Sequence, residues 1–464
     1  VCSSDLAGSW VASNHIEFTG LGAPLRLTTD LSLTHVQEGR PFSLVKKQHL
    51  ALTWGEPLES PLEATLDRFL GETVRYWRRW VKRTRVPRDY QEAVIRSALT
   101  LKLHQFEDTG AFLAATTTSL PEHPGSGRNW DYRFCWLRDT YFTLNALERL
   151  GHLQEMERFL NFLRDLCALR KDALQPLYGI NGEADLEERI LDHLDGYRGE
   201  KPVRIGNQAI EHVQNDVYGE MILAVKRFLV DKRFVGTEGV EGARELIDHL
   251  LRQIEARLEQ PDAGLWELRS EQKLHAFTVL MHWAGGRSVV TVAEELGDPD
   301  LTARGAQVRD RAREILLDRC WDSERGVLTQ AAGVRNLDAS MLLALQLGFF
   351  DGDDPRARSH VETIRAQLSI DGGLLRRYDV EDDFGIPKAA FTVCSFWLAE
   401  ALGMVGRVDE GRELLDRLLS LDNGLGLFSE DILPEDGSQS GNFPQTYSHV
   451  GLIHAAFRLS RPWD

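Results

Sequence analysis

The first part of the chain alternates apolar and polar residues with the period of a β-strand. The alternation runs through residues 25–33 and 42–54, and turn-forming residues interrupt it at 22–24 and 38–41. A period of two places the apolar side chains on one face of a sheet. We therefore predict β-structure over residues 11–55. Because a few strands are rarely stable alone, this segment should be the remainder of a β-sandwich or a sheet that lies against the rest of the chain.

A connecting helix follows Pro61, and from about Pro87 onward the apolar spacing is that of helices throughout. Val94, Ala98 and Leu101, for example, recur at i, i+4 and i+7, which is the spacing of one helix face. The same pattern continues to the C-terminus and predicts roughly a dozen helices. The predicted domains are a remnant of an N-terminal β-sandwich domain at 1–60, a linker helix at 61–86 and a helical domain at 87–464.

The connections between the predicted helices are alternately short and long. Aromatic residues, glycines, arginines and aspartates concentrate in the long ones, at residues 109–138, 178–207, 261–277, 371–388 and 423–444. Long loops after every second helix indicate a ring of helical pairs with the loops gathered on one face. An active site should then lie on that face. The alternative is a helical solenoid that serves as a scaffold, although scaffolds seldom carry their aromatic and acidic residues in loops.

The net charge of the chain argues against two classes of binding partner. The formal net charge of -17 argues against nucleic acid and anionic membrane surfaces, which both select basic proteins. We therefore interpret the one basic run, residues 78–83, as the solvated face of the linker helix. No apolar run is long enough to cross a bilayer, so a membrane partner is not expected either.

The number and spacing of the cysteines indicate the kind of cellular compartment in which the protein occurs. The five cysteines have no CxxC spacing, which predicts neither a disulfide framework nor a metal site. The chain shows no secretory signal, although it begins at Val1 rather than at Met. A reducing compartment is favoured, and we expect a cytoplasmic protein.

The stretch Gly127–Asp139 combines aromatic rings with charges more densely than a structural segment usually does. It holds four aromatic residues, three arginines and two aspartates. Charges resist burial unless they are paired, and aromatic faces beside guanidinium and carboxylate groups suit a neutral, hydroxyl-covered ligand such as a sugar. Arg138 and Asp139 are the adjacent pair expected in such a pocket. The alternative is that Asp139 caps the following helix and the aromatic residues fill the core.

Two glutamates in the long loops are candidates for proton transfer. Glu267 follows Trp266 in a loop that begins with glycine, and an apolar neighbour raises the pKa of a carboxyl group and suits it to donate a proton. Glu430 follows an apolar run in a later loop, and its neighbour Asp431 is an equal candidate. Glycoside hydrolysis needs two such groups, one acid and one base or nucleophile.

Several segments resemble the signature motifs of glycoside hydrolase family 15, the glucoamylase and trehalase-like family. The resemblance extends from about Thr109 to the C-terminus. The matching segments, in chain order, are AATTTSLP at 114–121, NWDYRFCWLRD at 129–139, GYRG at 196–199, PVRIGN at 202–207, DVYG at 216–219, GLWE at 264–267, LDAS at 337–340, GGLLRRY at 372–378 and GNFPQTYSH at 441–449. Their joint occurrence in this order is highly specific.

This resemblance implies a mainly α fold, an (α/α)6 toroid behind an N-terminal β-sandwich. It also implies exo-acting hydrolysis of α-linked glucosides from the non-reducing end, with inversion and release of β-glucose. Position by position, Glu267 corresponds to the general acid and Glu430 to the general base. The residues expected to bind the substrate are Trp136, Arg138, Asp139, Trp266, Arg377, Arg204, Gln214 and Asp216. An inverting pair stands about 6.5–9.5 Å apart to admit a water, and this chemistry needs neither a metal nor another cofactor.

Two features depart from the family pattern. The β-segment before Pro57 is shorter than the family's β-domain, so we expect an N-terminally truncated version with an exposed sheet edge and lower stability. Gly285 and Gly286 precede Arg287, where an acidic residue is expected. Since glycine weakens a helix by about 1 kcal/mol relative to alanine, local packing behind the loop of Glu267 should be disturbed.

Three classes of function follow from these observations. The leading one is a hydrolase of α-glucosides, either disaccharides or oligosaccharides. The pocket residues do not separate trehalose from maltose or starch, while the cysteine pattern and the lack of a signal favour trehalose. The second class is a non-catalytic carbohydrate-binding protein on the same toroid, which the two glutamates disfavour, and the third is the helical scaffold. The sequence leaves the oligomeric state open.

Overall fold

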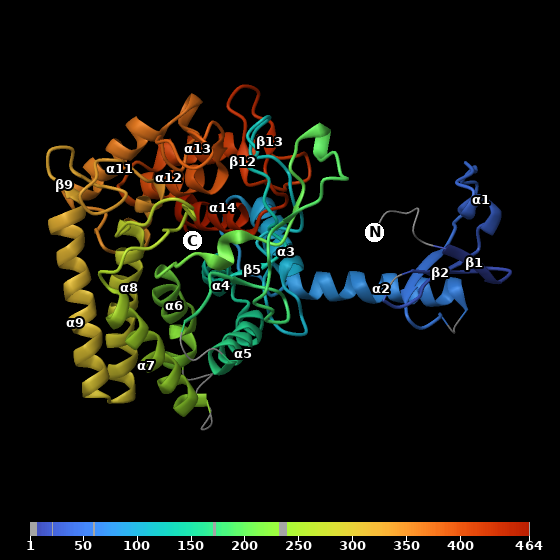
Figure 1. Cartoon of the computed structure of the whole chain (residues 1–464), viewed down its shortest axis with the longest axis horizontal. Helices are drawn as coiled ribbons and strands as arrows, with labels where there is room; N and C mark the ends of the chain where they lie inside the picture. Colours follow the sequence, from blue (N-terminus) through green and yellow to red (C-terminus); the bar gives the residue numbers. More distant parts are fainter. Residues whose placement is uncertain (1–6, 21, 59–60, 170–172, 232–238, 464) are drawn as a thin grey trace. The chain divides into compact units, whose positions relative to one another are not determined.

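The computed structural model describes residues 7–20, 22–58, 61–169, 173–231 and 239–463. The chain divides into two compact units, Val1–Arg83 and Thr84–Asp464, which are coloured from blue to red along the sequence in Figure 1. The assignment of the first sixty residues to a sandwich remnant and of the following helix to a linker stays a prediction.

The first unit is a four-stranded antiparallel sheet with two helices. Its elements are β1 (Ala7–Ala12), β2 (His15–Thr19), β3 (Leu25–Thr29), α1 (Leu33–Gln37), β4 (Leu50–Trp54) and α2 (Leu62–Val81). Each strand pairs with the next one in sequence. Ile16, Leu27 and Ala51 are buried, as expected for the apolar positions of alternating strands. The prediction of β-structure is confirmed for the parts of residues 11–55 that lie in these strands.

The alternating pattern was misleading between β3 and β4. Leu33 lies in the short helix α1, and Phe42 and Leu44 lie in irregular chain with 46% and 72% of their surfaces exposed. Alternation produces a strand only where a neighbouring strand can pair with it, and α1 occupies the start of this connection.

Arg78 and Arg79 are exposed near the end of α2, which confirms the solvated face predicted for the basic run.

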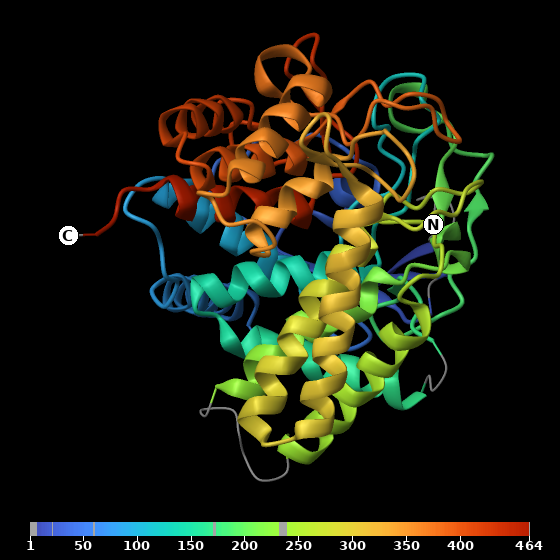
Figure 2. The same ribbon diagram turned by 90° about the vertical axis from the view of Figure 1, so that its left-hand side faces the viewer.

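The second unit is a ring of helical pairs. Its helices are α3 (Gln91–His104), α4 (Leu137–Leu150), α5 (Leu153–Leu169), α6 (Asp216–Val230), α7 (Gly239–Arg257), α8 (Ala276–Leu296), α9 (Pro299–Ile315), α10 (Leu343–Gln346), α11 (Pro355–Leu368), α12 (Thr392–Met404), α13 (Val408–Leu419) and α14 (Thr446–Leu459). The even-numbered helices from α4 to α14 form the inner ring, in which each contacts the next. Between α8 and α10 the contact is made by a 3-10 turn at Ala339–Leu342, which directly precedes α10 and also contacts α12. The ring closes where α14 contacts α4. The odd-numbered helices pack outside this inner ring, and Figure 2 shows the hairpin of α8 and α9 from its outer side.

Long connections lead into the inner helices and carry short strands. These are β5 (Cys135–Trp136) with β6 (Leu177–Tyr178), β7 (Arg189–Ile190) with β8 (Arg204–Ile205), β9 (Trp321–Asp322) with β10 (Val327–Leu328), and β11 (Ala390–Phe391) with β12 (Asp431–Ile432) and β13 (Gln439–Ser440). The short pairings hold the loops against each other at the N-terminal ends of the inner helices. The prediction that long loops follow every second helix and gather on one face is confirmed.

The two glycines of α8 do not disturb its packing, contrary to the prediction. The helix is continuous from Ala276 to Leu296. A Cβ atom on Gly285 would lie 3.1 Å from the Cα of Gly219 in α6, and one on Gly286 would lie 2.7 Å from the backbone nitrogen of Arg309 in α9. The glycines therefore permit a close approach of three helices, which offsets their low helix propensity.

The four cysteines among the described residues, Cys135, Cys167, Cys320 and Cys394, are free thiols. Cys2 lies outside the described residues. Within the part of the chain that the structure describes, none of the helices combines the length and apolar character needed to cross a bilayer.

Candidate active site

One cavity opens among the loops at the N-terminal ends of the inner helices. Its walls come from the segments before α4, α6, α8, α12 and α14. The lining side chains include Glu122, Arg128, Trp130, Tyr132, Trp136, Arg138, Asp139, Trp266, Glu267, Arg269, Arg377, Asp382, Asp383, Phe384, Phe391 and Tyr447. Five carboxylates therefore face four guanidinium groups between aromatic rings, so the cavity offers donors, acceptors and flat faces with little net charge.

Glu267 projects into this cavity from the loop before α8. The indole nitrogen of Trp136 donates to its Oε1 at 2.7 Å, and Nη2 of Arg138 donates to the same oxygen at 3.1 Å. The backbone of Glu267 has a φ of 60°, a left-handed conformation that costs a non-glycine residue about 1–3 kcal/mol and is typical of functional sites. The fold thus holds this carboxyl group in a strained but fixed position.

Asp262 organises the loop that carries Glu267. Its carboxylate accepts hydrogen bonds from the backbone nitrogens of Asn215 and Gly264 at 2.9 and 3.1 Å, and from the hydroxyl of Thr278 at 2.8 Å. Gly264 has a φ of 67°, and a Cβ atom there would lie 2.8 Å from the ring of His275. Glycine is required at this turn for both reasons.

Arg138 and Asp139 lie in the first turn of α4, and both are buried. Nη1 of Arg138 donates to Gln214 at 2.5 Å and to Asp216 at 3.3 Å. Although burial opposes it, the charges of Asp216 and Glu267 raise the pKa of Arg138, so its guanidinium stays charged. Burial raises the pKa of Asp139 to about 6, against the opposing charge of Arg138.

The helix-capping alternative for Asp139 is wrong. The cap of α4 is Trp136, with no capping hydrogen bond from its side chain, and Asp139 lies three residues further along. Its carboxyl group lines the cavity instead.

Glu430 lies immediately behind the cavity wall. Its side chain is fully buried, and it is absent from the described residues that line the cavity. The hydroxyl of Tyr132, which does line the cavity, donates to Oε1 of Glu430 at 2.7 Å, and the backbone nitrogen of Asn442 donates to Oε2 at 3.3 Å. Burial and the charge of Glu122 raise the pKa of Glu430 to about 8.

The neighbouring carboxyl group, Asp431, is also buried. Burial and the charges of Glu122 and Glu430 raise its pKa. The hydrogen bond from Tyr132 goes to Glu430 and connects that residue, rather than Asp431, with the cavity surface.

Glu267 and Glu430 are linked through two aromatic residues. Trp136 donates to Glu267 and Tyr132 donates to Glu430, and the two rings contact edge to face with centroids 5.4 Å apart. Glutamates 163 positions apart in the sequence (430 minus 267) therefore flank one aromatic pair. Of the two, Glu267 lines the cavity and Glu430 is connected to its surface through Tyr132.

Trp266 and Arg377 line another part of the cavity. The indole nitrogen of Trp266 donates to Asp338 at 2.8 Å, and both terminal nitrogens of Arg377 donate to Glu122, at 2.8 and 3.4 Å. A forked arginine–carboxylate pair fixes both planes, so Glu122 and Arg377 present an oriented donor and acceptor to a ligand.

The remaining predicted site residues, Arg204, Gln214 and Asp216, lie behind the lining residues. Gln214 and Asp216 hold Arg138. Arg204 stacks over Trp130 at 4.6 Å and pairs with Glu188 at 3.1 Å. These three residues position the wall of the cavity from behind.

Sequence reasoning did not single out several lining residues. Glu122 follows the 114–121 motif directly, and Tyr132 lies inside the 129–139 motif, so both were within reach of the pattern. Arg128 lies inside the stretch 127–139 that the sequence analysis singled out. Arg269, Asp382 and Asp383 could not be found from the sequence, because only the fold brings their loops to the cavity. Among the described residues, a group of side chains that could hold a metal ion lies in the first unit, at His49, Glu63 and Asp67.

Comparison with known sequences matches this chain to one family. The family model described as Glycosyl hydrolases family 15 matches residues 88–457. The trehalase of Thermoplasma volcanium is 35% identical over 390 residues, which are 84% of this chain and 62% of that protein. The trehalase of Mycobacterium tuberculosis is 36% identical over 452 residues, which are 94% of this chain and 65% of that protein. The chain thus spans less than two thirds of the length of these two relatives.

Solved structures share the fold at lower identity. A bacterial glucoamylase complexed with acarbose matches 96% of this chain and 73% of its own, with a TM-score of 0.69 and 14% identity. A structure described as "Glycosidase Wild Type" matches 79% of this chain and 96% of its own, with a TM-score of 0.61 and 21% identity. The likeness confirms the predicted toroid of six helical pairs.

Proposed function

Because the chain belongs to glycosyl hydrolase family 15, we propose that it hydrolyses the α-glucosidic bond of a small neutral sugar, with trehalose as the preferred substrate. The observation that carries this proposal is that Glu267, in the cavity, is linked through Trp136 and Tyr132 to Glu430, which lies directly behind the cavity wall. Glycoside hydrolysis requires two carboxyl groups near the bond that breaks. Trehalose is chosen because the two relatives described above are trehalases.

Substrate binding follows from the cavity lining. Arg138 and Asp139 provide adjacent donor and acceptor groups, and the forked pair of Glu122 and Arg377 provides a second set. Hydroxyl groups of a glucose unit can donate to the carboxylates and accept from the guanidinium groups. Trp130 offers an apolar face in the same cavity. Binding at several fixed points converts binding energy into orientation of the reacting carbon.

In the proposed reaction Glu267 is the general acid. It delivers its proton to the glycosidic oxygen as the bond from this oxygen to the anomeric carbon breaks. The carboxylate that remains is stabilised by Arg138 at 3.1 Å and by the indole N–H of Trp136 at 2.7 Å. Charge-assisted hydrogen bonds to a developing anion are among the strongest contributions to catalysis.

Glu430 is the proposed general base. Because it lies behind the cavity wall, it acts through Tyr132: the hydroxyl of Tyr132 takes up a proton from the water that attacks the anomeric carbon and passes its own proton to Oε1 of Glu430, 2.7 Å away. Attack from the face opposite the leaving oxygen inverts the configuration. Trehalose then gives one β-glucose from the attacked half and one α-glucose from the leaving half.

The test is glucose release by the wild-type chain and by E267Q and E430Q. Each variant keeps the shape of the side chain but cannot exchange the proton, so we expect kcat to fall by about 10²–10⁴-fold. E271Q is the matched control, since Glu271 is exposed and pairs with Lys273, and it should retain wild-type turnover. Undiminished turnover in E267Q or E430Q would remove that residue from the mechanism.

Proton NMR at early times tests the stereochemistry. Inversion predicts equal amounts of β- and α-glucose from trehalose, whereas retention gives α-glucose alone. Maltose, isomaltose and soluble starch tested in parallel define the substrate class. Release from maltose and starch instead of trehalose would make the chain a glucoamylase, and binding of trehalose without glucose release would identify a carbohydrate-binding protein.

A further inference from the structure

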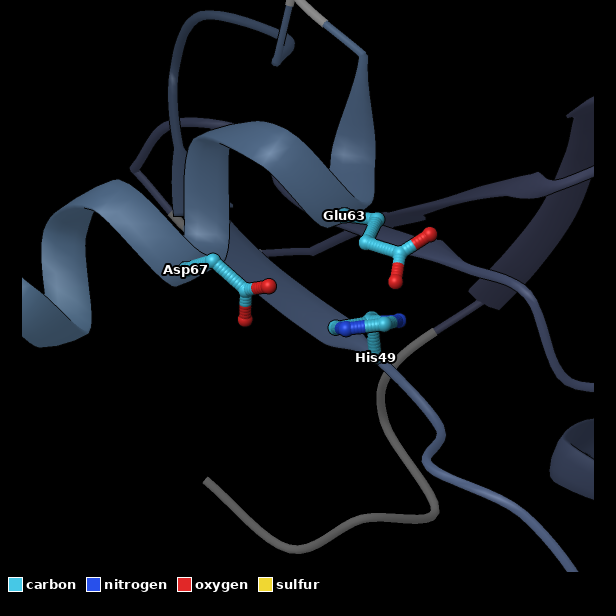
Figure 3. A group of neighbouring side chains, drawn as sticks. All are labelled: His49, Glu63 and Asp67. Carbon is cyan, nitrogen blue, oxygen red and sulfur yellow. The ribbon is translucent and has the colours of Figure 1, made fainter.

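A second group of polar side chains lies in the first unit, outside the proposed active site. His49 directly precedes β4, and Glu63 and Asp67 lie near the start of α2. Because residues i and i+4 share one face of a helix, both carboxylates point toward the imidazole ring (Figure 3). One ligand atom from each of the three side chains lies within 4.8 Å of the other two. From this arrangement we propose a binding site for a divalent transition-metal ion of the zinc type.

The orientation of His49 supports this site. Only 6% of its surface is exposed. Its Nδ1 lies 2.9 Å from Oδ2 of Asp30, and its backbone nitrogen donates to Oδ1 of the same residue at 2.8 Å. An ionised carboxylate oxygen can only accept a hydrogen bond, so Nδ1 carries the hydrogen in this contact. The lone pair is then on Nε2.

Nε2 of His49 is buried and has no hydrogen-bond partner among the described residues. A buried polar atom without a partner is costly and needs an explanation. A carboxylate on one imidazole nitrogen with the other nitrogen free is the arrangement that orients metal-binding histidines. Asp30 therefore acts as the orienting carboxylate, and Nε2 is the ligand.

The set of ligands favours zinc-like ions over magnesium or calcium. One imidazole nitrogen with two carboxylate oxygens suits Zn²⁺, Co²⁺ or Mn²⁺, whereas Mg²⁺ and Ca²⁺ prefer oxygen ligands throughout. Bonds of about 2.0–2.2 Å place tetrahedral ligands about 3.4 Å apart, so a small rotation of the exposed Glu63 and Asp67 side chains closes the site. Three protein ligands leave a fourth position for water.

The local charge also favours a divalent cation. Asp30, Glu63 and Asp67 contribute three negative charges, and Lys47 contributes one positive charge through its ion pair with Asp67. Lys47 competes with the metal for Asp67, so metal binding must displace this ammonium group, after which the three carboxylates leave an excess of negative charge around the ion. The bound ion would join the start of α2 to the edge strand β4.

Isothermal titration calorimetry of the full chain with zinc chloride, after removal of metals with a chelator, tests the proposal. We expect one saturable site per chain. E63Q and D67N should each weaken binding by at least about ten-fold. E72Q is the matched control, because Glu72 is an exposed residue of the same helix that pairs with Arg68, and the same change of charge there should leave the affinity unchanged.

The variant K47M provides a test in the opposite direction. Removing the competing ammonium group should increase the affinity for zinc. Circular dichroism checks that each variant retains the wild-type fold, and visible absorption of bound Co²⁺ reports whether the coordination is tetrahedral. The proposal is overturned if zinc shows no saturable binding, if E63Q and D67N bind like E72Q, or if K47M binds more weakly than the wild type.

Discussion

Glu267 and Glu430 lie in opposite electrostatic surroundings. Arg138 lies 3.1 Å from Glu267, whereas Glu430 is fully buried near the charge of Glu122, and its pKa rises to about 8. A general base must lose its proton before it can act. The base form of Glu430 is therefore the minor form at neutral pH in the ligand-free protein.

This arrangement predicts the pH dependence of kcat/KM, which reports on the free enzyme. If Glu430 is the base, kcat/KM rises with pH along a limb whose midpoint lies near pH 8, because a raised pKa keeps the carboxyl group protonated below that value. Initial rates of glucose release from trehalose between pH 5 and 9 measure the limb. A falling limb near pH 8 would exchange the acid and base roles of the two glutamates.

The hydroxyl of Tyr132 affects the same titration. Its hydrogen bond to Glu430 lowers the pKa of that carboxyl group, because it favours the ionised form. Y132F should therefore move the rising limb of kcat/KM to higher pH. A variant whose limb stays at the wild-type position, even with a reduced rate, would show that the hydroxyl does not tune Glu430.

Gly441 determines where Glu430 can lie. A Cβ atom on Gly441 would be 2.8 Å from both Cβ and Oε2 of Glu430, and its φ is 74°. G441A should displace the carboxyl group and lower kcat by about 100-fold, the usual cost of a misplacement near 1 Å. G424A is the control, since Gly424 has a φ of 77° in the same loop with nothing within 4 Å. Equal rates in the two variants would contradict this role.

At the scale of elements, the inner helices are held by close backbone contacts. Gly286 of α8 faces the backbone of α9, where a Cβ atom would lie 2.7 Å from the nitrogen of Arg309 and 2.9 Å from the oxygen of Gly305. Backbone atoms cannot rotate away as the end of a flexible side chain can. The close packing of α8 and α9 therefore depends on the absence of a side chain.

G286A should destabilise the second unit by about 1–3 kcal/mol, because the added methyl group overpacks the interface. G242A in α7 is the matched control, since a Cβ atom there would meet the flexible end of the Arg164 side chain, Nη2 at 3.1 Å and Cζ at 3.7 Å, rather than a backbone. Alanine should stabilise that position by up to about 1 kcal/mol. Urea unfolding followed by circular dichroism measures both changes, and a loss of stability in G242A equal to that in G286A would refute the packing argument.

At the scale of the whole molecule, burial shifts the pKa values of carboxyl groups and of histidines in opposite directions. Burial raises the pKa of Asp262 to about 7, with a contribution from Asp216, and that of Glu430 to about 8. Burial lowers the pKa of His282 and His360 to about 4. Folding therefore holds protons on the carboxyl groups and removes them from the imidazoles.

The sign of the pH dependence of stability follows from these shifts. Between about pH 4 and 6.5 the unfolded chain has lost carboxyl protons and kept histidine protons, so the two effects on unfolding free energy oppose each other. Above about pH 7.5 nearly all histidines are neutral in both states, and only carboxyl groups with raised pKa still matter. We expect the free energy of unfolding to fall by about 1 kcal/mol between pH 7.5 and 9, measured by urea unfolding. A rise over this interval would contradict the prediction.

Much of the fold could be predicted from local patterns in the sequence. Helical periodicity and the alternation of short and long connections predicted the ring of helical pairs, because those patterns depend on residues close in the chain. Local patterns gave a wrong prediction for Phe42 and Leu44, because no neighbouring strand pairs with this segment. They were also wrong for Gly285 and Gly286, because close contacts with α6 and α9 offset the low helix propensity of glycine.

The candidate active site could likewise be predicted from the sequence only in part. The sequence by itself determined the fold class and the motif residues Trp136, Arg138 and Glu267, because those motifs are continuous segments. Only the tertiary structure decided that Glu430 lies behind Tyr132 and that Arg204, Gln214 and Asp216 support the cavity wall from outside it. It also brought together residues from distant loops, such as Glu122 with Arg377. Burial, and with it the protonation of each carboxyl group, depends on what packs around a residue in space, and no local pattern contains that information.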